Sequence, residues 1–270
     1  MPRPPRSSDA SPPTVSPTDQ AELARQWVDA AHRVVVLTGA GISTDSGIPD
    51  FRGPQGIWTR NPAAEKMSDI RYYLADPEVR KAAWQSRLHH PAWTARPNRG
   101  HQAIVALEKR GRLHGLITQN IDELHQIAGN SPDKVVEVHG TVRRVMCWQC
   151  GTRSPMEDAL ARVRAGETDP ACTRCGGILK SDTISFGQNL VPEVIDKAFE
   201  LSREADLMLA IGSTLSVYPA AGVVPQAKEN GARIVILNAE PTAMDELADV
   251  VIHGAIGEFL PRICGLDDTD

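Results

Sequence analysis

Short apolar runs recur along the chain, and each is followed by glycine or polar residues. The first run, Val34–Leu37, shows no alternation of polar and apolar positions. Uniformly apolar runs are typical of strands covered on both faces, as in a parallel sheet. Further strands are expected in the segments 113–120, 135–140, 206–215, 232–240 and 249–254.

Segments with helical spacing separate these runs. The first begins near Ala21, with Thr18 or Asp19 as its expected N-cap, and others lie at 101–112, 121–129, 191–205 and 220–231, with a helical turn at 244–248. Strands that alternate with helices in this way predict an α/β fold with a doubly wound parallel, Rossmann-like sheet. Such sheets bind ligands beyond the carboxyl ends of their strands, so the residues after each run carry the functional information.

Two segments interrupt the alternation, and a tail precedes it. Residues 57–100 have no strand pattern and predict a helical insert broken by prolines, and residues 145–181 contain the paired cysteines. The tail has six prolines and six serines or threonines, and no apolar periodicity. The expected organisation is a disordered tail (1–18), a Rossmann-like domain (19–56, 101–144 and 182–266), a helical insert (57–100) and a zinc-binding module (145–181).

The cysteines form two C-x-x-C pairs, each followed by glycine, and the 21 residues between the pairs leave room for a helix. Four thiolates in this arrangement bind Zn²⁺ tetrahedrally, and a site closed by four cysteines is structural rather than catalytic. A redox pair fits less well, because the two pairs form a matched set. The predicted ligands are Cys147, Cys150, Cys172 and Cys175, and Cys264 is expected to be an ordinary core residue.

Charge and composition limit the classes of partner. The formal net charge of −5 argues against nucleic-acid binding by general electrostatics. No apolar run has the length of a membrane span, and the first residues contain no apolar signal segment, so a cytoplasmic protein is expected.

Glycines follow the first predicted strand, at Gly39 and Gly41, and they permit a tight turn whose amide groups face a phosphate. The third position of the dinucleotide fingerprint holds Thr44 instead of glycine, so a plain tight turn explains this pattern almost as well. The loop then continues to Arg52, which would pair with phosphate, and Phe51, which would cover a ring. A surface loop with a buried Phe51 is the alternative.

Polar residues also follow the later strands, at 118–122, 139, 212–214 and 238–240. Asn120 and Asp122 suit hydrogen bonds to hydroxyls and carboxamides, although each alone is also a common helix cap. His139 is the best candidate for a general base, and the other seven histidines are expected at the surface or in packing. Five polar strand ends in one sheet together predict a nucleotide site.

The order of these motifs resembles the sirtuin family of NAD-dependent protein deacylases, in particular its bacterial members. The matching stretches are GAGIS (39–43), GIPDFR (47–52), TQNID (118–122), HG (139–140), the cysteine pairs, FG (186–187), GSTLSVYPA (212–220) and Asn238. The resemblance covers about residues 34–260, nearly the whole globular part.

The resemblance implies a role for each matching residue. His139 would be the catalytic base, aided by Asn120 and Asp122, and NAD would be a co-substrate beside one structural zinc. Cofactor contacts would come from Gly39, Ala40, Gly41, Ser43, Ile48, Asp50, Phe51, Arg52, Gln119, Asn120, Ile121, Asp122, Gly212, Ser213, Thr214, Asn238, Ala239, Glu240 and Ala255. An acyl-lysine peptide would lie as a strand among Ile184, Ser185, Phe186, Gly187, Leu215, Ser216 and Val217.

The implied reaction transfers an acyl group from lysine to ADP-ribose. The acyl oxygen attacks the ribose carbon as nicotinamide leaves, His139 removes a ribose proton, and the products are lysine, nicotinamide and O-acyl-ADP-ribose. Acylated proteins are the expected partners, without membrane or nucleic acid. The alternatives are a mono-ADP-ribosyltransferase, a deacylase for longer or acidic acyl groups, a catalytically idle zinc scaffold, and, last, a zinc-ribbon nucleic-acid module.

The chain departs from the family pattern in ways that concern acyl preference. It has Gln188 after Phe-Gly where the family often has glutamate, and GST at 212–214 where the family has GTS or GSS. Desuccinylating relatives have Tyr-x-x-Arg facing the acyl group, whereas this chain has Trp84 and Arg87 at that spacing. Arg87 is therefore expected near the acyl group without its phenol partner, which favours neutral acyl groups. A different alignment of this helix would make Trp84 a core residue.

Overall fold

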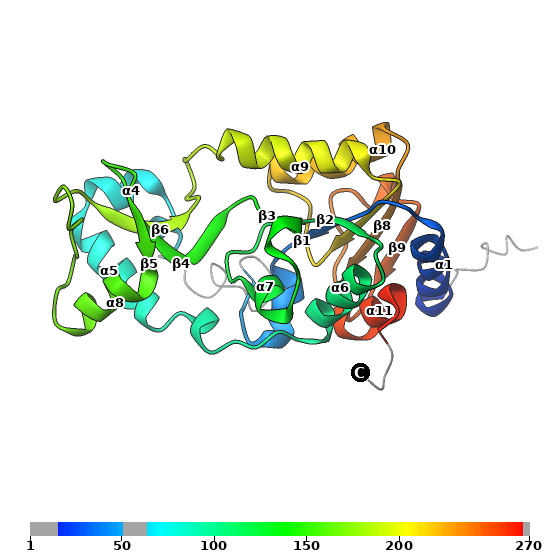
Figure 1. Ribbon diagram of the computed structural model, residues 1–270, viewed down its shortest axis with the longest axis horizontal. Helices are drawn as coiled ribbons and strands as arrows, with labels where there is room; N and C mark the ends of the chain where they lie inside the picture. Colours follow the sequence, from blue (N-terminus) through cyan, green and yellow to red (C-terminus); the bar gives the residue numbers. More distant parts are fainter. Residues whose placement is uncertain (1–15, 51–63, 267–270) are drawn as a thin grey trace, which may run out of the picture.

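Parallel strands form the central sheet of the computed structural model, which describes residues 16–50 and 64–266. The sheet contains β1 (Val34–Thr38), β2 (Leu113–Thr118), β3 (Val135–Glu137), β7 (Leu207–Ile211), β8 (Arg233–Asn238) and β9 (Val250–His253), in the order β3-β2-β1-β7-β8-β9 (Figure 1). This order confirms the doubly wound sheet. The connections reverse direction beside β1, which is where such sheets bind ligands.

Helices cover both faces of the sheet because the side chains of each strand alternate between them. Val34 and Val36 of β1 pack under α1 (Pro17–Ala30), α6 (Arg99–Lys109) and α11 (Ile256–Cys264). Val35 and Leu37 pack under α9 (Pro192–Glu204) and α10 (Val223–Glu229). All five residues of β1 are buried, as the uniform apolar run predicts.

Two helices differ from the sequence prediction. Helix α1 begins at Pro17 rather than near Ala21, because the Ser16 hydroxyl accepts a hydrogen bond from the Asp19 amide at 3.2 Å. Helix α11 was not predicted, since Pro261 lies inside it. The remaining elements of the large domain are α7 (Leu124–Ala128) and the 3₁₀ turns Ala40–Ser46, Pro91–Trp93, Pro132–Lys134, Ala220–Gly222 and Asp245–Leu247.

A small domain lies beside the large sheet (Figure 1). Its antiparallel sheet has the order β5-β4-β6, and its elements are α3 (Ala64–Met67), α4 (Ile70–Ala75), α5 (Pro77–Leu88), β4 (Gly140–Cys147), β5 (Arg153–Pro155), α8 (Met156–Arg164) and β6 (Leu179–Thr183). This sheet extends beyond 145–181 at both ends. Trp84 packs with Val145 and Cys147 in one apolar cluster, so the helical insert and the cysteine segment share a core.

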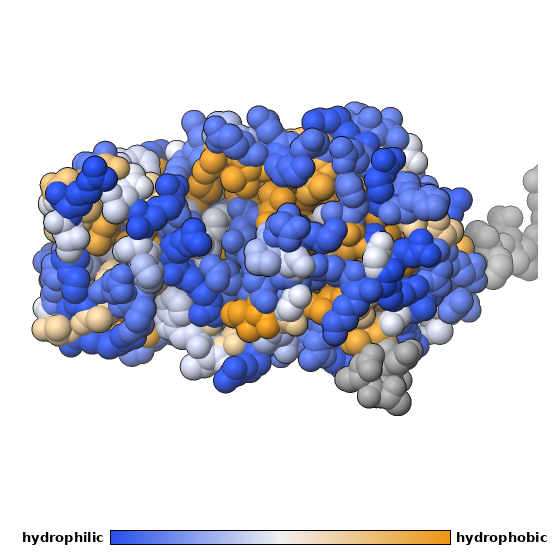
Figure 2. Space-filling model, viewed as in Figure 1, coloured by the Kyte–Doolittle hydropathy of each residue, from blue (hydrophilic) through white to orange (hydrophobic). Residues whose placement is uncertain are grey.

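Polar residues cover most of the face shown in Figure 2, and apolar residues gather along α9. Among the helices of the described ranges, none combines the length and hydropathy needed to cross a bilayer.

Glycines bring the turns after β1 and β7 into backbone contact. The Gly39 amide donates to the Ile211 carbonyl at 3.0 Å, and the Gly41 amide donates to the Gly212 carbonyl at 2.9 Å. Gly212 has a φ of +63°, and a Cβ there would lie 2.6 Å from the Ile42 nitrogen. The position therefore excludes a side chain both by conformation and by space.

We predict that Gly212→Ala destabilises the protein more than Gly111→Ala does. Gly111 has a φ of +68°, but a Cβ added there would have no atom within 4 Å, so this position isolates the conformational cost. We expect a loss of about 1 kcal/mol for Gly111→Ala and about 2 kcal/mol more for Gly212→Ala, because of overpacking. Urea unfolding monitored by circular dichroism measures both, and equal losses would contradict the steric argument.

Candidate functional site

The predicted polar residues gather at the carboxyl ends of the parallel strands. Gly39 follows β1, the 119–122 segment follows β2, His139 comes two residues after β3, Gly212 follows β7 and Asn238 ends β8. Parallel pairing of these strands places their ends at one edge of the sheet.

The turn after β1 uses its glycines differently from the prediction. The amides of Gly39 and Gly41 donate to carbonyls of the β7 end, and the Ile42 amide donates to the Gly39 carbonyl at 3.2 Å. These amides are therefore committed to the protein. The small size of the glycines serves the contact between the two turns.

Asn120 is the centre of a buried group of polar side chains. Its amide nitrogen donates to the Gly39 carbonyl at 3.1 Å and to Ser43 Oγ at 3.2 Å, and Ser43 Oγ donates to Asp122 Oδ2 at 2.7 Å. Burial raises the pKa of Asp122, while hydrogen bonds from the Leu124 amide and Ser43 oppose the rise. Within the described residues the amide oxygen of Asn120 makes no hydrogen bond and remains free to accept one from a ligand.

His139 has a fixed tautomer. Its Nδ1 lies 2.9 Å from the Gln119 carbonyl oxygen. Because a carbonyl only accepts, Nδ1 carries the hydrogen and the lone pair of the neutral ring is on Nε2. Burial lowers the pKa of His139 below 6.5, although the Gln119 carbonyl opposes the shift. The ring is therefore neutral at pH 7 and can accept a proton at Nε2.

Other predicted cofactor residues form hydrogen bonds within and between the segments that follow the strands. Gln119 Nε2 donates to Ser213 Oγ at 2.9 Å, which links β2 to β7, and Thr214 Oγ1 lies 2.9 Å from Ser216 Oγ. The Asn238 amide nitrogen donates to the Glu240 carbonyl at 2.7 Å. Ala239 and Glu240 are exposed, and Ala255 is the N-cap of α11.

The loop after the first turn is described only as far as Asp50. Phe51 and Arg52 lie outside the described residues. Ala40, Ile48 and Asp50 are half-buried, and the Ile48 amide donates to the Ser43 carbonyl at 3.2 Å. Ile121 is also half-buried, and its carbonyl accepts from the Val142 amide at 2.9 Å.

The two segments predicted to hold a peptide strand have unpaired backbone groups. The Phe186 amide and carbonyl bond Ser68 and Ile70, and the Ser185 amide donates to the side chain of Gln188 at 3.3 Å. Within the described part of the chain, the backbone amides and carbonyls of Gly187 and Ser216 make no hydrogen bond. Ile184 is tied to the catalytic region, because its amide donates to the His139 carbonyl at 2.8 Å. Leu215 is buried with a φ of 54°, and Val217 is half-buried.

Trp84 and Arg87 lie in the small domain. Trp84 is fully buried in the core of this domain. The Arg87 guanidinium stacks on the Trp84 ring, with its carbon Cζ 4.6 Å from the ring centroid. Arg87 Nε donates to Ser181 Oγ at 2.7 Å, and Nη1 donates to the Tyr73 hydroxyl at 3.2 Å. The expectation that Arg87 lacks a phenol partner is therefore wrong. The phenol comes from Tyr73 on α4, a helix that local spacing around Arg87 does not reveal.

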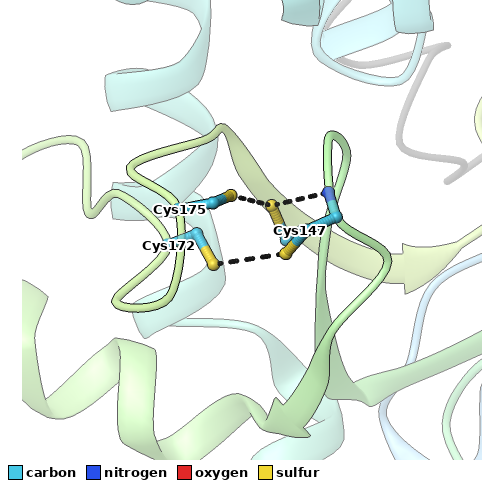
Figure 3. A group of neighbouring side chains, drawn as sticks. Cys147, Cys172 and Cys175 are labelled. Atoms are coloured by element: carbon cyan, nitrogen blue, oxygen red, sulfur yellow. Dashed lines mark hydrogen bonds between the residues drawn. The ribbon is translucent and has the colours of Figure 1, made fainter.

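The four paired cysteines form a site that fits zinc. Their sulfurs all lie within 4.8 Å of one another, with Cys147 and Cys175 at 3.5 Å and Cys150 and Cys172 at 3.8 Å (Figure 3). A tetrahedral Zn²⁺ with Zn–S bonds of about 2.3 Å requires sulfurs about 3.8 Å apart. All four positions are filled by protein, so zinc here would be structural and would fix the ends of β4 and the loop before β6.

Thr38 and Tyr73 were not predicted at these sites, and Thr118 was predicted only as one of the polar residues at a strand end. Thr38 and Thr118 end β1 and β2, and the Thr38 hydroxyl donates to Thr118 Oγ1 at 2.9 Å. The backbone amide of Asn120 donates to Thr118 Oγ1 at 3.1 Å, so the two threonines help to hold the Asn120 backbone in place. A polar residue that ends an apolar strand is the signal that identifies both. Tyr73 carries no comparable signal.

The fold and the site define an enzyme of the nucleotide-binding α/β class with an added zinc module. The Sir2 family model matches residues 39–219. The NAD-dependent protein deacetylase 2 of Streptomyces coelicolor is 51% identical over 85% of this chain and 95% of its own length. A solved Sir2 complex with a p53 peptide and NAD⁺ has a TM-score of 0.79 at 34% identity, covering 89% of this chain and 95% of that one. A second Sir2 structure, with a deacetylated p53 peptide and 3′-O-acetyl-ADP-ribose, has a TM-score of 0.82 at 34% identity, covering 90% and 96%. The chain belongs to the Sir2 family.

We predict that Cys147→Ala abolishes zinc binding. Removing one ligand from a closed site leaves three, and the bound metal should fall from about one ion per chain to nearly none. Zinc analysis of the purified protein measures this, and thermal unfolding should show a lower midpoint. Cys264→Ala is the matched control, because Cys264 is buried in the large domain and should leave the zinc content unchanged. Retention of a full zinc equivalent in Cys147→Ala would show that the four thiols are not the ligands.

Proposed function

We propose that this chain removes acetyl groups from lysine side chains of proteins and consumes NAD in the reaction. The observation that carries the proposal is the grouping of His139, with its lone pair on Nε2, and the buried Asn120 and Asp122 at the point where the strand order reverses. Homologues named as NAD-dependent protein deacetylases support the same conclusion.

The residues at this edge of the sheet fit NAD. The Asn120 amide oxygen and His139 Nε2 remain unpaired in the described structure, and Gln119, Ser213 and Asn238 offer hydroxyl and amide groups for riboses and phosphates. NAD supplies, when bound, the ribose carbon that takes the acyl oxygen and the nicotinamide that leaves. Hydrogen-bond donors and acceptors fixed in advance lower the cost of that charge movement.

His139 acts as the base in this proposal. Its Nδ1–H is held by the Gln119 carbonyl, so only Nε2 can take the proton of a ribose hydroxyl. Removal of that proton would allow the ribose oxygen to capture the acyl carbon, and attack of a water molecule on the same carbon would then break its bond to nitrogen, which frees lysine and leaves O-acyl-ADP-ribose. Asp122, held by Ser43 and the Leu124 amide, would face the carboxamide of nicotinamide.

The acylated peptide would bind through its backbone. Gly187 and Ser216 both offer unpaired amide and carbonyl groups, which is what strand addition requires. Main-chain pairing leaves the sequence of the substrate protein largely open. The acyl-lysine side chain then determines recognition.

We predict that His139→Ala lowers kcat for deacetylation about 10²- to 10⁴-fold, the usual contribution of a positioned base. In the native protein kcat/KM should be flat from about pH 7 to 8, because the neutral ring is the active form. It should fall as the pH drops through a value below 6.5, because burial lowers the pKa of His139. Nicotinamide release and peptide mass measure both effects.

His32→Ala is the control, because His32 is exposed and only its backbone amide is hydrogen-bonded. Native-like deacetylation by His139→Ala would refute the role of the base. A peptide that gains the mass of ADP-ribose instead of losing its acyl group would favour the ADP-ribosyltransferase alternative.

The acyl preference proposed from sequence remains a preference for neutral groups, for a revised reason. Arg87 is bonded to Ser181 and Tyr73 and stacked on Trp84, so its guanidinium belongs to the small-domain core. The Tyr73 hydroxyl donates to the Leu179 carbonyl at 2.8 Å, so its hydrogen is also bonded within the protein. An acidic acyl group would have to compete for groups that already have partners.

We predict that kcat/KM is at least about tenfold higher for an acetyl-lysine peptide than for the succinyl-lysine peptide of the same sequence, a difference of one hydrogen-bonding interaction or more. Arg87→Gln should leave this ratio within about threefold of native, because the Arg87 guanidinium is already bonded to Ser181 and Tyr73 and stacked on Trp84. Parallel kinetics on both peptides give the ratio. A higher value for succinyl-lysine would overturn the proposed preference.

We also propose that the protein acts in the cytoplasm without binding nucleic acid directly. The cysteines of the described ranges are free thiols, four of them in metal geometry, which suits a reducing compartment. The net charge of −5 gives nucleic acid no general attraction.

A further inference from the structure

Two histidines that take no part in the proposed chemistry lie buried beneath the site. His101 is the third residue of α6, His125 is in α7, and they are 0% and 1% exposed. Their ring centroids are 4.9 Å apart at an angle of 56°. Burial of two imidazoles in contact is costly unless their hydrogen-bonding groups are matched.

A neighbouring donor determines which ring nitrogen of His101 carries the hydrogen. The Asn98 backbone amide lies 3.3 Å from His101 Nδ1, and an amide can only donate. Nδ1 therefore holds the lone pair. Burial lowers the pKa of His101 to about 4, so the ring is neutral at pH 7 and its hydrogen is on Nε2.

The hydrogen on His125 follows from two threonines. The Thr38 hydroxyl donates to Thr118 Oγ1, so its oxygen accepts from His125 Nε2 at 2.9 Å. Burial, and then the neighbouring His101, lower the pKa of His125 well below 6.5. His125 is therefore neutral, with its hydrogen on Nε2 and its lone pair on Nδ1.

The two groups that remain are complementary. His101 Nε2–H is a donor, His125 Nδ1 is an acceptor, and neither has a hydrogen-bond partner within the described residues. Either ring with its hydrogen on the other nitrogen would lose the bond from Asn98 or the bond to Thr38.

The pair joins two parts of the site. The Asn98 side chain donates to the Ile42 carbonyl at 2.8 Å and to Ser46 Oγ at 2.9 Å, which holds the 3₁₀ turn after β1. On the other side, His125 Nε2 bonds the Thr38 hydroxyl, and this hydroxyl donates to Thr118 Oγ1. The same Thr118 oxygen accepts a hydrogen bond from the backbone amide of Asn120.

We propose that His101 and His125 are positioning residues, which set the orientation of Asn120 and of the Ala40–Ser46 turn through the hydrogen bonds to Asn98 and Thr38 that their tautomers fix. This proposal rests on the proposed function. The pair touches neither the peptide segments nor His139, so it should affect the rate of nicotinamide release and deacetylation rather than peptide binding.

Two variants of His125 that differ in reach test the proposal. The amide nitrogen of glutamine reaches the place of Nε2 and can still donate to Thr38, whereas that of asparagine reaches only the place of Nδ1. We expect His125→Asn to lower kcat about 10- to 100-fold, as misplaced catalytic groups do, with the peptide KM within about twofold of native. His125→Gln should recover most of the rate. Ile104→Val, in the same core beside His101, controls for lost packing.

Equal rate losses in His125→Asn and His125→Gln, a change in peptide KM alone, or native rates in both variants would overturn the proposal. The tautomers are measured separately by ¹⁵N NMR of histidine-labelled native protein, without any substrate. Both buried rings should be neutral at pH 7 with hydrogen on Nε2. A ring with hydrogen on Nδ1, or a charged ring, would also overturn it. Because the spectra need no turnover, they distinguish failure of this proposal from absence of deacetylase activity.

Discussion

The contact between two backbone turns is the constraint on which the site depends. The turns after β1 and β7 meet at the Gly41–Gly212 hydrogen bond, with no room for a side chain at Gly212. The contact joins the ends of the adjacent strands β1 and β7, where the connections of the sheet reverse direction. The Gly39 carbonyl is thereby held where the Asn120 side chain can reach it, at 3.1 Å. The same glycines that resemble a phosphate loop are thus required first by packing.

Burial of polar groups explains why the site is ordered through side-chain bonds. Asn120, Asp122 and Ser43 are at most 8% exposed, and groups so buried must find partners in the protein. Each of them bonds a neighbour in this group through its side chain. His139 follows the same rule, since the Gln119 carbonyl takes one nitrogen and leaves the other free. The hydrogen-bond partners inside the protein therefore determine which atom of each side chain is still able to form another hydrogen bond.

Sequence patterns predicted the sheet, the cysteine cluster and most polar strand ends, because each depends on local spacing. The apolar run at Val34–Leu37 and the C-x-x-C pairs show their structure within a few residues. Tyr73 and the histidine pair depend on packing between distant segments. His101 and His125 were expected to be surface or packing residues, and no local pattern shows that their rings meet. The pairing of β4 with β6, from Gly140 with Thr183 to Cys147 with Leu179, likewise joins positions far apart in the sequence.

The small domain extends the same logic to acyl recognition. Trp84 from the helical insert packs with Val145 and the metal-site residue Cys147, so the position of α5 depends on the cysteine cluster. Arg87 on that helix is in turn fixed by Ser181 of β6 and by Tyr73 of α4. Zinc bound by the four cysteines would therefore stabilise the core that holds α5 and Arg87 in place. In the large domain the strand ends hold His139 and Asn120, and in the small domain the packing of the core holds Arg87.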